Sequence, residues 1–166
     1  MAILTGVLVM GLALILQMTV FSRITLLAGS PDLLLVILAA WVMQPRVKTA
    51  WHWAVIAGLM IGFTSAVPLF VPVFGYLAVI GLGYLLQRQV WQAPFLATLI
   101  INFIGTLVGL VLTFLVLQLY GRSLPFIDSF GLVILPGILL NLLLAFPIYY
   151  LVNELAQLIY PSEVEA

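Results

Sequence analysis

Residues 94–120 read PFLATLIINFIGTLVGLVLTFLVLQLY, and this stretch contains no charged side chain. A helix of this length, at about 1.5 Å of rise per residue, is longer than the roughly 30 Å hydrocarbon core of a bilayer and can cross it with tilt. The run therefore predicts a membrane-spanning helix. It also indicates the class of the whole protein, because the rest of the chain has a similar composition.

The 166 residues are 66% hydrophobic and 6% charged, with a formal net charge of zero. A globular domain has about 25% charged residues, and a soluble protein of this size could not hide so much apolar surface. The absence of a basic patch argues against binding to nucleic acid, and the absence of cysteine excludes disulfides and cysteine metal sites. We expect an all-α, polytopic membrane protein surrounded by the lipid bilayer.

Prolines and charged residues divide the chain into six apolar segments, each of which we expect to be a helix. Their ranges are 3–21, 31–43, 49–66, 73–86, 94–120 and 129–159. The second spans only about 20 Å, so neighbouring helices must shield it or it must sit off-centre. Pro136 and Pro147 should kink the last helix or split off a short re-entrant segment before Pro136. Residues 1–160 would form a single six-helix transmembrane domain, and residues 161–166 a short acidic tail.

The stretch Ser30-Pro31-Asp32 is typical of the start of a helix. We predict Ser30 as the N-cap, Pro31 in the first turn, and Asp32 near the positive end of the helix dipole. We also place Asp32 near a membrane boundary, where surface ion pairs are expected rather than a proton relay. Three further charged residues are expected at the same boundary: Asp128, Arg122 and Arg23.

Six crossings would put both termini on one side of the membrane. That side would collect three basic residues, Arg46, Lys48 and Arg88, against two on the other side, Arg23 and Arg122. Because basic residues are more frequent in cytoplasmic loops, we predict cytoplasmic termini. The tail residues Glu163 and Glu165 would then lie in the cytoplasm, as a solvated end or in contact with a partner.

Small and polar residues recur at helical spacing on three of the predicted helices. In residues 94–120 they are Thr98, Asn102, Thr106, Gly109 and Thr113, and Gly105 and Gly109 form a G-x-x-x-G pair. In residues 129–159 they are Gly137, Asn141, Ala145, Tyr149 and Asn153. In residues 49–66 they are Ala54, Gly58 and Gly62. Such stripes are typical of close helix packing, and the alternative hypothesis is that they line a polar cavity. Asn102 and Asn141 must face protein, because lipid cannot satisfy an amide. We interpret Gln17 as a hydrogen-bonding residue between helices or between subunits.

The sequence offers no recognisable catalytic or metal-binding set. His52 is the only histidine, and we interpret it with its neighbours Trp51 and Trp53 as an anchor at the membrane interface. A lone histidine cannot assemble a metal site without partners. We find no serine–histidine–acid set, paired carboxylates or phosphate-binding loop, so we expect neither an enzyme nor a cofactor.

Two stretches resemble the rod shape-determining protein MreD family. One is Pro31-Asp32-Leu33-Leu34-Leu35-Val36, which follows Leu16-Gln17, and the other is residues 136–150, PGILLNLLLAFPIYY. The family positions are Pro31, Asp32, Pro136, Asn141 and Pro147, and Gly58, Gly62 and Gly75 fall where that family has glycines. The resemblance covers nearly the whole chain. One departure is the end of the third helix, where many members carry an aspartate and this chain has Phe63-Thr64-Ser65-Ala66.

The resemblance implies a non-enzymatic scaffold in the bacterial inner (cytoplasmic) membrane, in the cell-elongation complex that controls cell shape and lateral peptidoglycan synthesis. The implied partner is MreC, a single-pass protein with a periplasmic domain, and through it MreB filaments, the RodA glycosyltransferase and its partner transpeptidase. We expect MreC to dock on lipid-facing small and aromatic residues. The candidates for helix packing or for the partner interface are Gly58, Gly62, Gly105, Gly109 and Gly137.

A second hypothesis remains open, because MreD proteins look similar to the substrate-binding subunits of energy-coupling-factor vitamin transporters, which are also small six-helix proteins. On that hypothesis a pocket for a small polar molecule would be lined by Asn102, Thr106, Asn141 and Tyr149. The short apolar loop at residues 67–71, VPLFV, offers few polar groups to a vitamin, which favours the scaffold.

Overall fold

The computed structural model describes residues 2–47, 49–88, 93–122 and 125–160, and these residues form helices joined by turns. Six long or medium helices are present in this part of the chain: α1 (Ala2–Thr19), α2 (Leu33–Val42), α3 (Trp51–Thr64), α4 (Phe70–Gln87), α5 (Pro94–Leu119) and α7 (Leu135–Ile159). Three short elements accompany them: the 3-10 turn η1 (Phe21–Arg23), α6 (Phe126–Ser129) and the π-helical turn η2 (Phe130–Ile134). The prediction of an all-α protein is confirmed for the described residues.

Four helical runs are long and apolar enough to cross a membrane: Leu4–Arg23, Phe70–Gln87, Pro94–Leu119 and Phe126–Ile159. α2 and α3 are apolar but shorter. The chain is therefore a helical membrane protein. Whether all six segments cross the bilayer remains a prediction.

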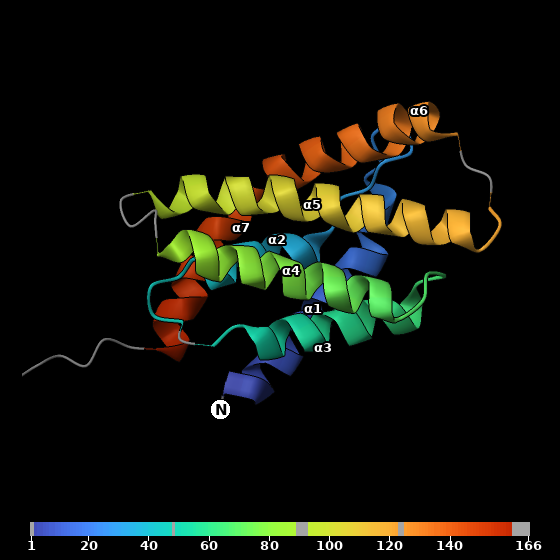
Figure 1. The fold of residues 1–166 in the computed structure, drawn as a ribbon. Helices are drawn as coiled ribbons and strands as arrows, with labels where there is room; N and C mark the ends of the chain where they lie inside the picture. The colour runs from blue at the N-terminus through green and yellow to red at the C-terminus, as the bar shows by residue number, and fades with distance from the viewer. Residues whose placement is uncertain (1, 48, 89–92, 123–124, 161–166) are drawn as a thin grey trace, which may run out of the picture.

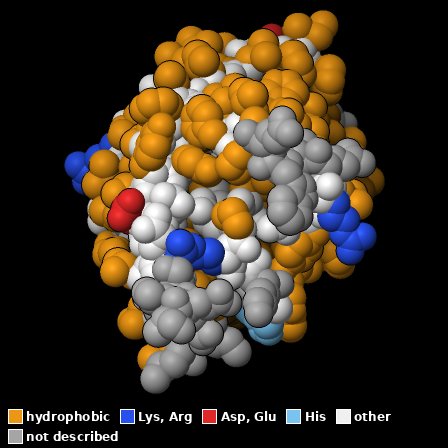
Figure 2. Space-filling model, turned by 90° about the vertical axis from the view of Figure 1, so that its left-hand side faces the viewer, with side chains coloured by type: hydrophobic (Ala, Val, Ile, Leu, Met, Phe, Trp, Pro, Cys, Tyr) orange, Lys and Arg blue, Asp and Glu red, His pale blue; other side chains and the backbone are white. Residues whose placement is uncertain are grey.

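The helices α1, α2, α3, α4, α5 and α7 form one bundle, and each of them runs in the opposite direction to the one before it (Figure 1). The start of α1 and the end of α7 lie together at the left-hand end of the bundle, and the turn between α3 and α4 lies at the right-hand end. Figure 2 views the left-hand end and shows basic side chains and the histidine among apolar side chains. The predicted acidic tail, with Glu163 and Glu165, and Lys48 fall outside the described residues.

Helix α2 is the centre of the bundle, because all ten of its residues are buried. Helices α1, α4, α5 and α7 pack around it. At about 1.5 Å per residue α2 is roughly 15 Å long, about half the thickness of the hydrocarbon core. The prediction that neighbouring helices shield this short helix is confirmed.

One predicted helix start is wrong, and of the two alternatives for the last helix, a kink or a split before Pro136, the split is not observed. α4 begins at Phe70, three residues earlier than predicted, and carries Pro72 in its first turn. Proline is tolerated there because the first N–H groups of a helix have no acceptor within the helix. The last segment is also not split before Pro136: α6, η2 and α7 form one continuous run, and a π-helical turn immediately precedes this proline.

The interpretation of Trp51, His52 and Trp53 as one interfacial anchor is only partly right. Trp51 is half-exposed and stacks on His52, with ring centroids 3.6 Å apart. Trp53 is instead buried, and it stacks on Trp41 of α2 at 4.0 Å. Residues two positions apart on a helix point about 200° apart, so Trp51 faces outward while Trp53 enters the core.

Candidate functional site

Helix α2 begins inside the protein, and its first turn is capped by Asp32. The Oδ1 atom of Asp32 accepts a hydrogen bond from the Leu35 N–H at 3.0 Å, and the hydroxyl of Tyr76 in α4 donates to Oδ1 at 3.0 Å and to Oδ2 at 2.9 Å. The predicted N-cap Ser30 is therefore wrong by two residues. The placement of Asp32 in a surface ion pair is also wrong, because its carboxylate meets neutral donors within the bundle.

Gln17 of α1 holds the same turn from another side. Its Nε2 donates to the Pro31 carbonyl at 2.8 Å, and its Oε1 accepts from the Leu33 N–H at 2.8 Å. The first N–H groups of a helix lack acceptors within the helix, so a buried helix start needs such partners. Gln17 thus bonds between segments of one chain, as one of its two interpretations expected.

Asn141 of α7 links α2 to α5. Its Oδ1 accepts from the Asp32 N–H at 2.7 Å, and its Nδ2 donates to Oγ1 of Thr106 at 2.8 Å. Asn102 donates from Nδ2 to the Asn141 carbonyl at 2.9 Å. Asn102, Thr106 and Asn141 are all buried, which confirms that the two asparagine amides face protein.

The loop before α2 packs onto the wide turn that Pro136 creates. Proline has no N–H, so it cannot donate to the Leu132 carbonyl four residues earlier, and that carbonyl accepts from the Ala28 N–H at 3.0 Å. A Cβ at Gly29 would lie 2.7 Å from both the Gly137 nitrogen and the Val133 oxygen. Only glycine allows this approach of two backbones, and no pattern in the sequence distinguishes Gly29.

The candidate interface glycines mostly pack within the chain. A Cβ at Gly58 would lie 2.6 Å from the Cα of Val73, and one at Gly62 would lie 2.9 Å from Leu69, both in the α3–α4 hairpin. Likewise Gly105 faces Val79 of α4, and Gly137 faces Leu110 of α5. Gly109 differs, because a Cβ there would meet nothing within 4 Å.

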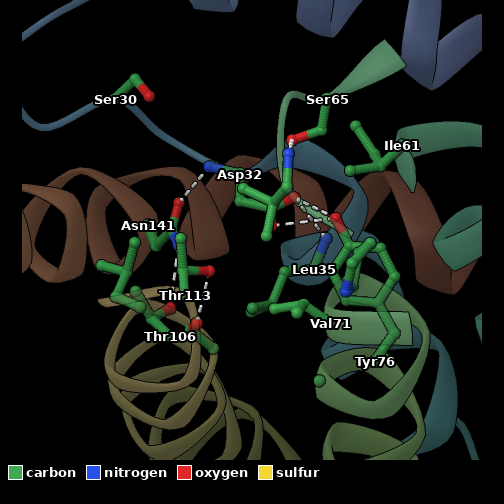
Figure 3. A pocket seen from close by; sticks show the side chains of 15 residues that line it. Ser30, Asp32, Leu35, Ile61, Ser65, Val71, Tyr76, Thr106, Thr113 and Asn141 are labelled. Carbon is green, nitrogen blue, oxygen red and sulfur yellow. Dashed lines mark hydrogen bonds between the residues drawn. The ribbon is translucent and has the colours of Figure 1, made fainter. Parts of the chain in front are cut away.

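Gly109 faces open space because a cavity of about 130 Å³ lies there, between the start of α2, the α3–α4 turn, α5 and α7 (Figure 3). Its polar wall consists of Ser30, Asp32, Ser65, Tyr76, Thr106, Thr113 and Asn141. Its apolar wall includes Leu35, Ile61, Val67, Val71, Pro72 and Leu110. The stripe on α5 therefore does both things that the sequence left open: it packs at Gly105 and lines a cavity from Thr106 to Thr113.

Two residues expected in a pocket do not line this one. Asn102 lies behind Thr106, bonded to α7. Tyr149 lies two turns further along α7 and packs edge-on against Phe95, with ring centroids 5.3 Å apart. Pro147, one of the residues on which the family resemblance rests, lies in the middle of α7, where it is exposed and does not line the cavity. Of the four residues predicted for a pocket, Thr106 and Asn141 line this cavity, and Asn102 and Tyr149 do not.

No protein-family model, curated protein or solved structure matches this chain. Within the described residues, no group of three or more histidine, aspartate or glutamate side chains could hold a metal ion. One carboxylate, several hydroxyls and an amide surround a small cavity. These hydrogen-bonding groups can hold the start of a helix or a small molecule.

Proposed function

We propose that this chain is a non-enzymatic scaffold subunit of the bacterial cell-elongation complex, of the MreD type, that binds an MreC-like single-pass protein within the cytoplasmic membrane. One observation carries the proposal. The two stretches that resemble the family are far apart in sequence, yet they meet in the fold, where the Asp32 N–H donates to Oδ1 of Asn141 at 2.7 Å. Residues that define a family by their joint role are expected to meet in this way.

Most of the described residues lie in helices and few lie in connecting loops, which fits a scaffold that acts through its helix faces. The connections between the described helices are short, and most large exposed side chains are apolar. In a membrane such side chains face lipid or another membrane helix, and helices associate there through close packing and hydrogen bonds. MreB, RodA and its partner transpeptidase would be reached through the MreC-like protein.

The outward face of α7 is the docking face that we propose. Leu139, Leu143, Phe146 and Tyr150 are exposed and follow steps of four, three and four residues, so they form one stripe. The rings of Phe146 and Tyr150 meet edge-on at 5.4 Å. Aromatic side chains are enriched in interfaces, where they supply large contact areas. The glycines Gly58, Gly62, Gly105 and Gly137 are already occupied within the chain.

Co-purification with an MreC-like protein from the same organism tests the proposal. Both chains are co-expressed, extracted in mild detergent and passed over a size-exclusion column. We expect a stoichiometric complex that the pair Leu143→Ala and Phe146→Ala weakens. The matched control is Leu8→Ala with Leu12→Ala on α1, whose side chains are also exposed and apolar. Absence of a complex with folded protein would contradict the scaffold.

The cavity at Asp32 supports a second candidate function, a substrate-binding subunit of an energy-coupling-factor type transporter. Thr106 and Asn141 line it as that hypothesis requires, whereas Asn102 and Tyr149 do not. The two functions predict different partners, because a transporter subunit assembles with a pair of ATPases and a scaffold does not. Co-purification with an ATPase pair from the same organism would favour the transporter.

A further inference from the structure

A carboxylate with only neutral partners stands in the wall of the cavity. Asp32 accepts hydrogen bonds from the Leu35 amide and the Tyr76 hydroxyl, and among the described residues no lysine or arginine lines the cavity. Asp32 keeps part of its surface open while its neighbours in α2 are buried. An ionised carboxylate inside a membrane protein is costly unless a cation neutralises it. The site therefore favours a positively charged group.

The two walls of the cavity indicate what kind of cation fits. Asp32, Thr106 and Asn141 lie on the polar wall, and Leu35 and Val71 on the apolar wall (Figure 3). A bare metal ion needs oxygen ligands at about 2–2.6 Å on all sides, which a space of about 130 Å³ with one carboxylate does not provide. A molecule with a cationic head and a short hydrocarbon body matches both walls.

The cavity adjoins a larger one towards one end of the molecule. Ser65 and Val67 line both this cavity and a larger one of about 420 Å³, which Arg122 and Tyr120 border beyond the end of α5. That end lies opposite the start of α1 and the end of α7 (Figure 1). A small molecule would enter from that side of the membrane.

We infer that the cavity binds a small organic ammonium compound, a primary amine with a short aliphatic chain. The ammonium group pairs with the Asp32 carboxylate, and the chain lies along the apolar wall. The residues proposed to dock the partner on α7 do not line this cavity, so binding of an amine and binding of a membrane partner are tested separately.

Calorimetric titration of the purified full chain in detergent with n-butylamine hydrochloride tests the inference, and 1-butanol serves as the uncharged probe. We expect saturable binding of the amine and none of the alcohol. Asp32→Asn keeps an N-cap side chain and removes the charge, so it should weaken amine binding about ten-fold or more, the worth of one charge-assisted hydrogen bond. The matched control is Asp128→Asn, because Asp128 is an exposed carboxylate outside the cavity.

A plug variant tests the position of the site without touching the charge. Gly109→Leu places its Cβ in open space and its branched end in the cavity, so it should abolish binding, whereas Gly81→Leu, at an exposed glycine of α4 whose Cβ also meets nothing, should leave binding unchanged. Each variant is accepted only if its size-exclusion profile and thermal midpoint match those of the unmodified chain. Equal binding of butanol, no binding by the folded chain, or unaltered binding by both Asp32→Asn and Gly109→Leu would overturn the inference. None of these outcomes bears on the complex with an MreC-like protein.

Discussion

Helices α1 and α2 have similar apolar sequences and opposite surroundings. On α1, Leu4, Leu8 and Leu12 are each more than 60% exposed, whereas no residue of α2 is more than 8% exposed. Hydropathy measures the tendency of a segment to leave water, and an apolar helix can leave water either for lipid or for the protein interior. The comparison teaches that a membrane helix becomes a core helix through its length and its neighbours.

The two helices also differ in where their polar bonds come from. The side chains of α2 carry one polar group, the buried indole N–H of Trp41, and the first turn is held by Gln17 from α1, Tyr76 from α4 and Asn141 from α7. A helix that starts inside a bundle cannot give its N–H groups to water, so its neighbours must supply the acceptors.

The largest effect that sharpens this comparison is expected at the middle of α2. Leu38 is fully buried, so Leu38→Ala should leave a void and lower the free energy of unfolding by about 3 kcal/mol. Reversible unfolding in mixed micelles of increasing sodium dodecyl sulfate measures this. A loss below about 1 kcal/mol would mean that α2 is not a packed core helix.

A somewhat smaller loss is expected when the link between α7 and α2 is removed. Asn141→Leu keeps the size of the side chain but removes the acceptor of the Asp32 N–H and the amide that donates to the Thr106 hydroxyl, which should cost about 2 kcal/mol. The same unfolding assay applies. Asn153→Leu on the same helix is the matched control, since Asn153 lies outside the polar cluster, and equal losses for the two variants would contradict the assigned role.

The link between α1 and α2 should contribute less. Gln17→Leu removes two hydrogen bonds, to the Pro31 carbonyl and from the Leu33 N–H, at a cost of about 1 kcal/mol, because hydrogen bonds between membrane helices average about 0.6 kcal/mol each. Amide hydrogen exchange offers a local measurement. We expect faster exchange of the Leu33 amide with little change in the middle of α2. Unchanged exchange at Leu33 would contradict the hydrogen bond that Gln17 accepts from it.

The smallest effect is expected on the exposed face of α1. Leu12→Ala exchanges a lipid-facing side chain for a smaller one and should change the free energy of unfolding by less than about 0.5 kcal/mol. Compared with Leu38→Ala in the same assay, it isolates the effect of surroundings on one substitution. A loss as large as that of Leu38→Ala would show that α1 is covered by protein on this face.

Sequence patterns predicted the polar cluster better than they predicted its organisation. Gln17, Asn102, Thr106 and Asn141 could be selected because each is a polar group in an apolar helix that must find a partner. Tyr76 could not, because a tyrosine in a membrane helix also suits the interface. Asp32 was assigned to the surface for the same kind of reason, since a helix-start signal does not tell how deep in the bundle the helix starts.

Close approaches of backbones were equally hard to foresee. Gly58 and Gly62 stand in a helical repeat, which is a recognisable pattern, and they pack against α4. Gly29 stands alone in a loop, and its need to be glycine arises from residues 133–137, about a hundred positions later in the chain. Gly109 had the same pattern as Gly105 but faces a cavity, because spacing defines a helix face and not what lies opposite it.

The sequence by itself determined that this protein is a bundle of apolar helices in a membrane, since 66% hydrophobic and 6% charged residues leave no stable alternative in water. It also determined that the few polar side chains in those helices need hydrogen-bond partners within the protein, because lipid offers none. Only the tertiary structure decided that α2 lies at the centre and that its first turn joins residues from α1, α4 and α7. The reason is that hydrogen-bond partners and cavities depend on distances between segments remote in sequence, which local periodicity does not contain.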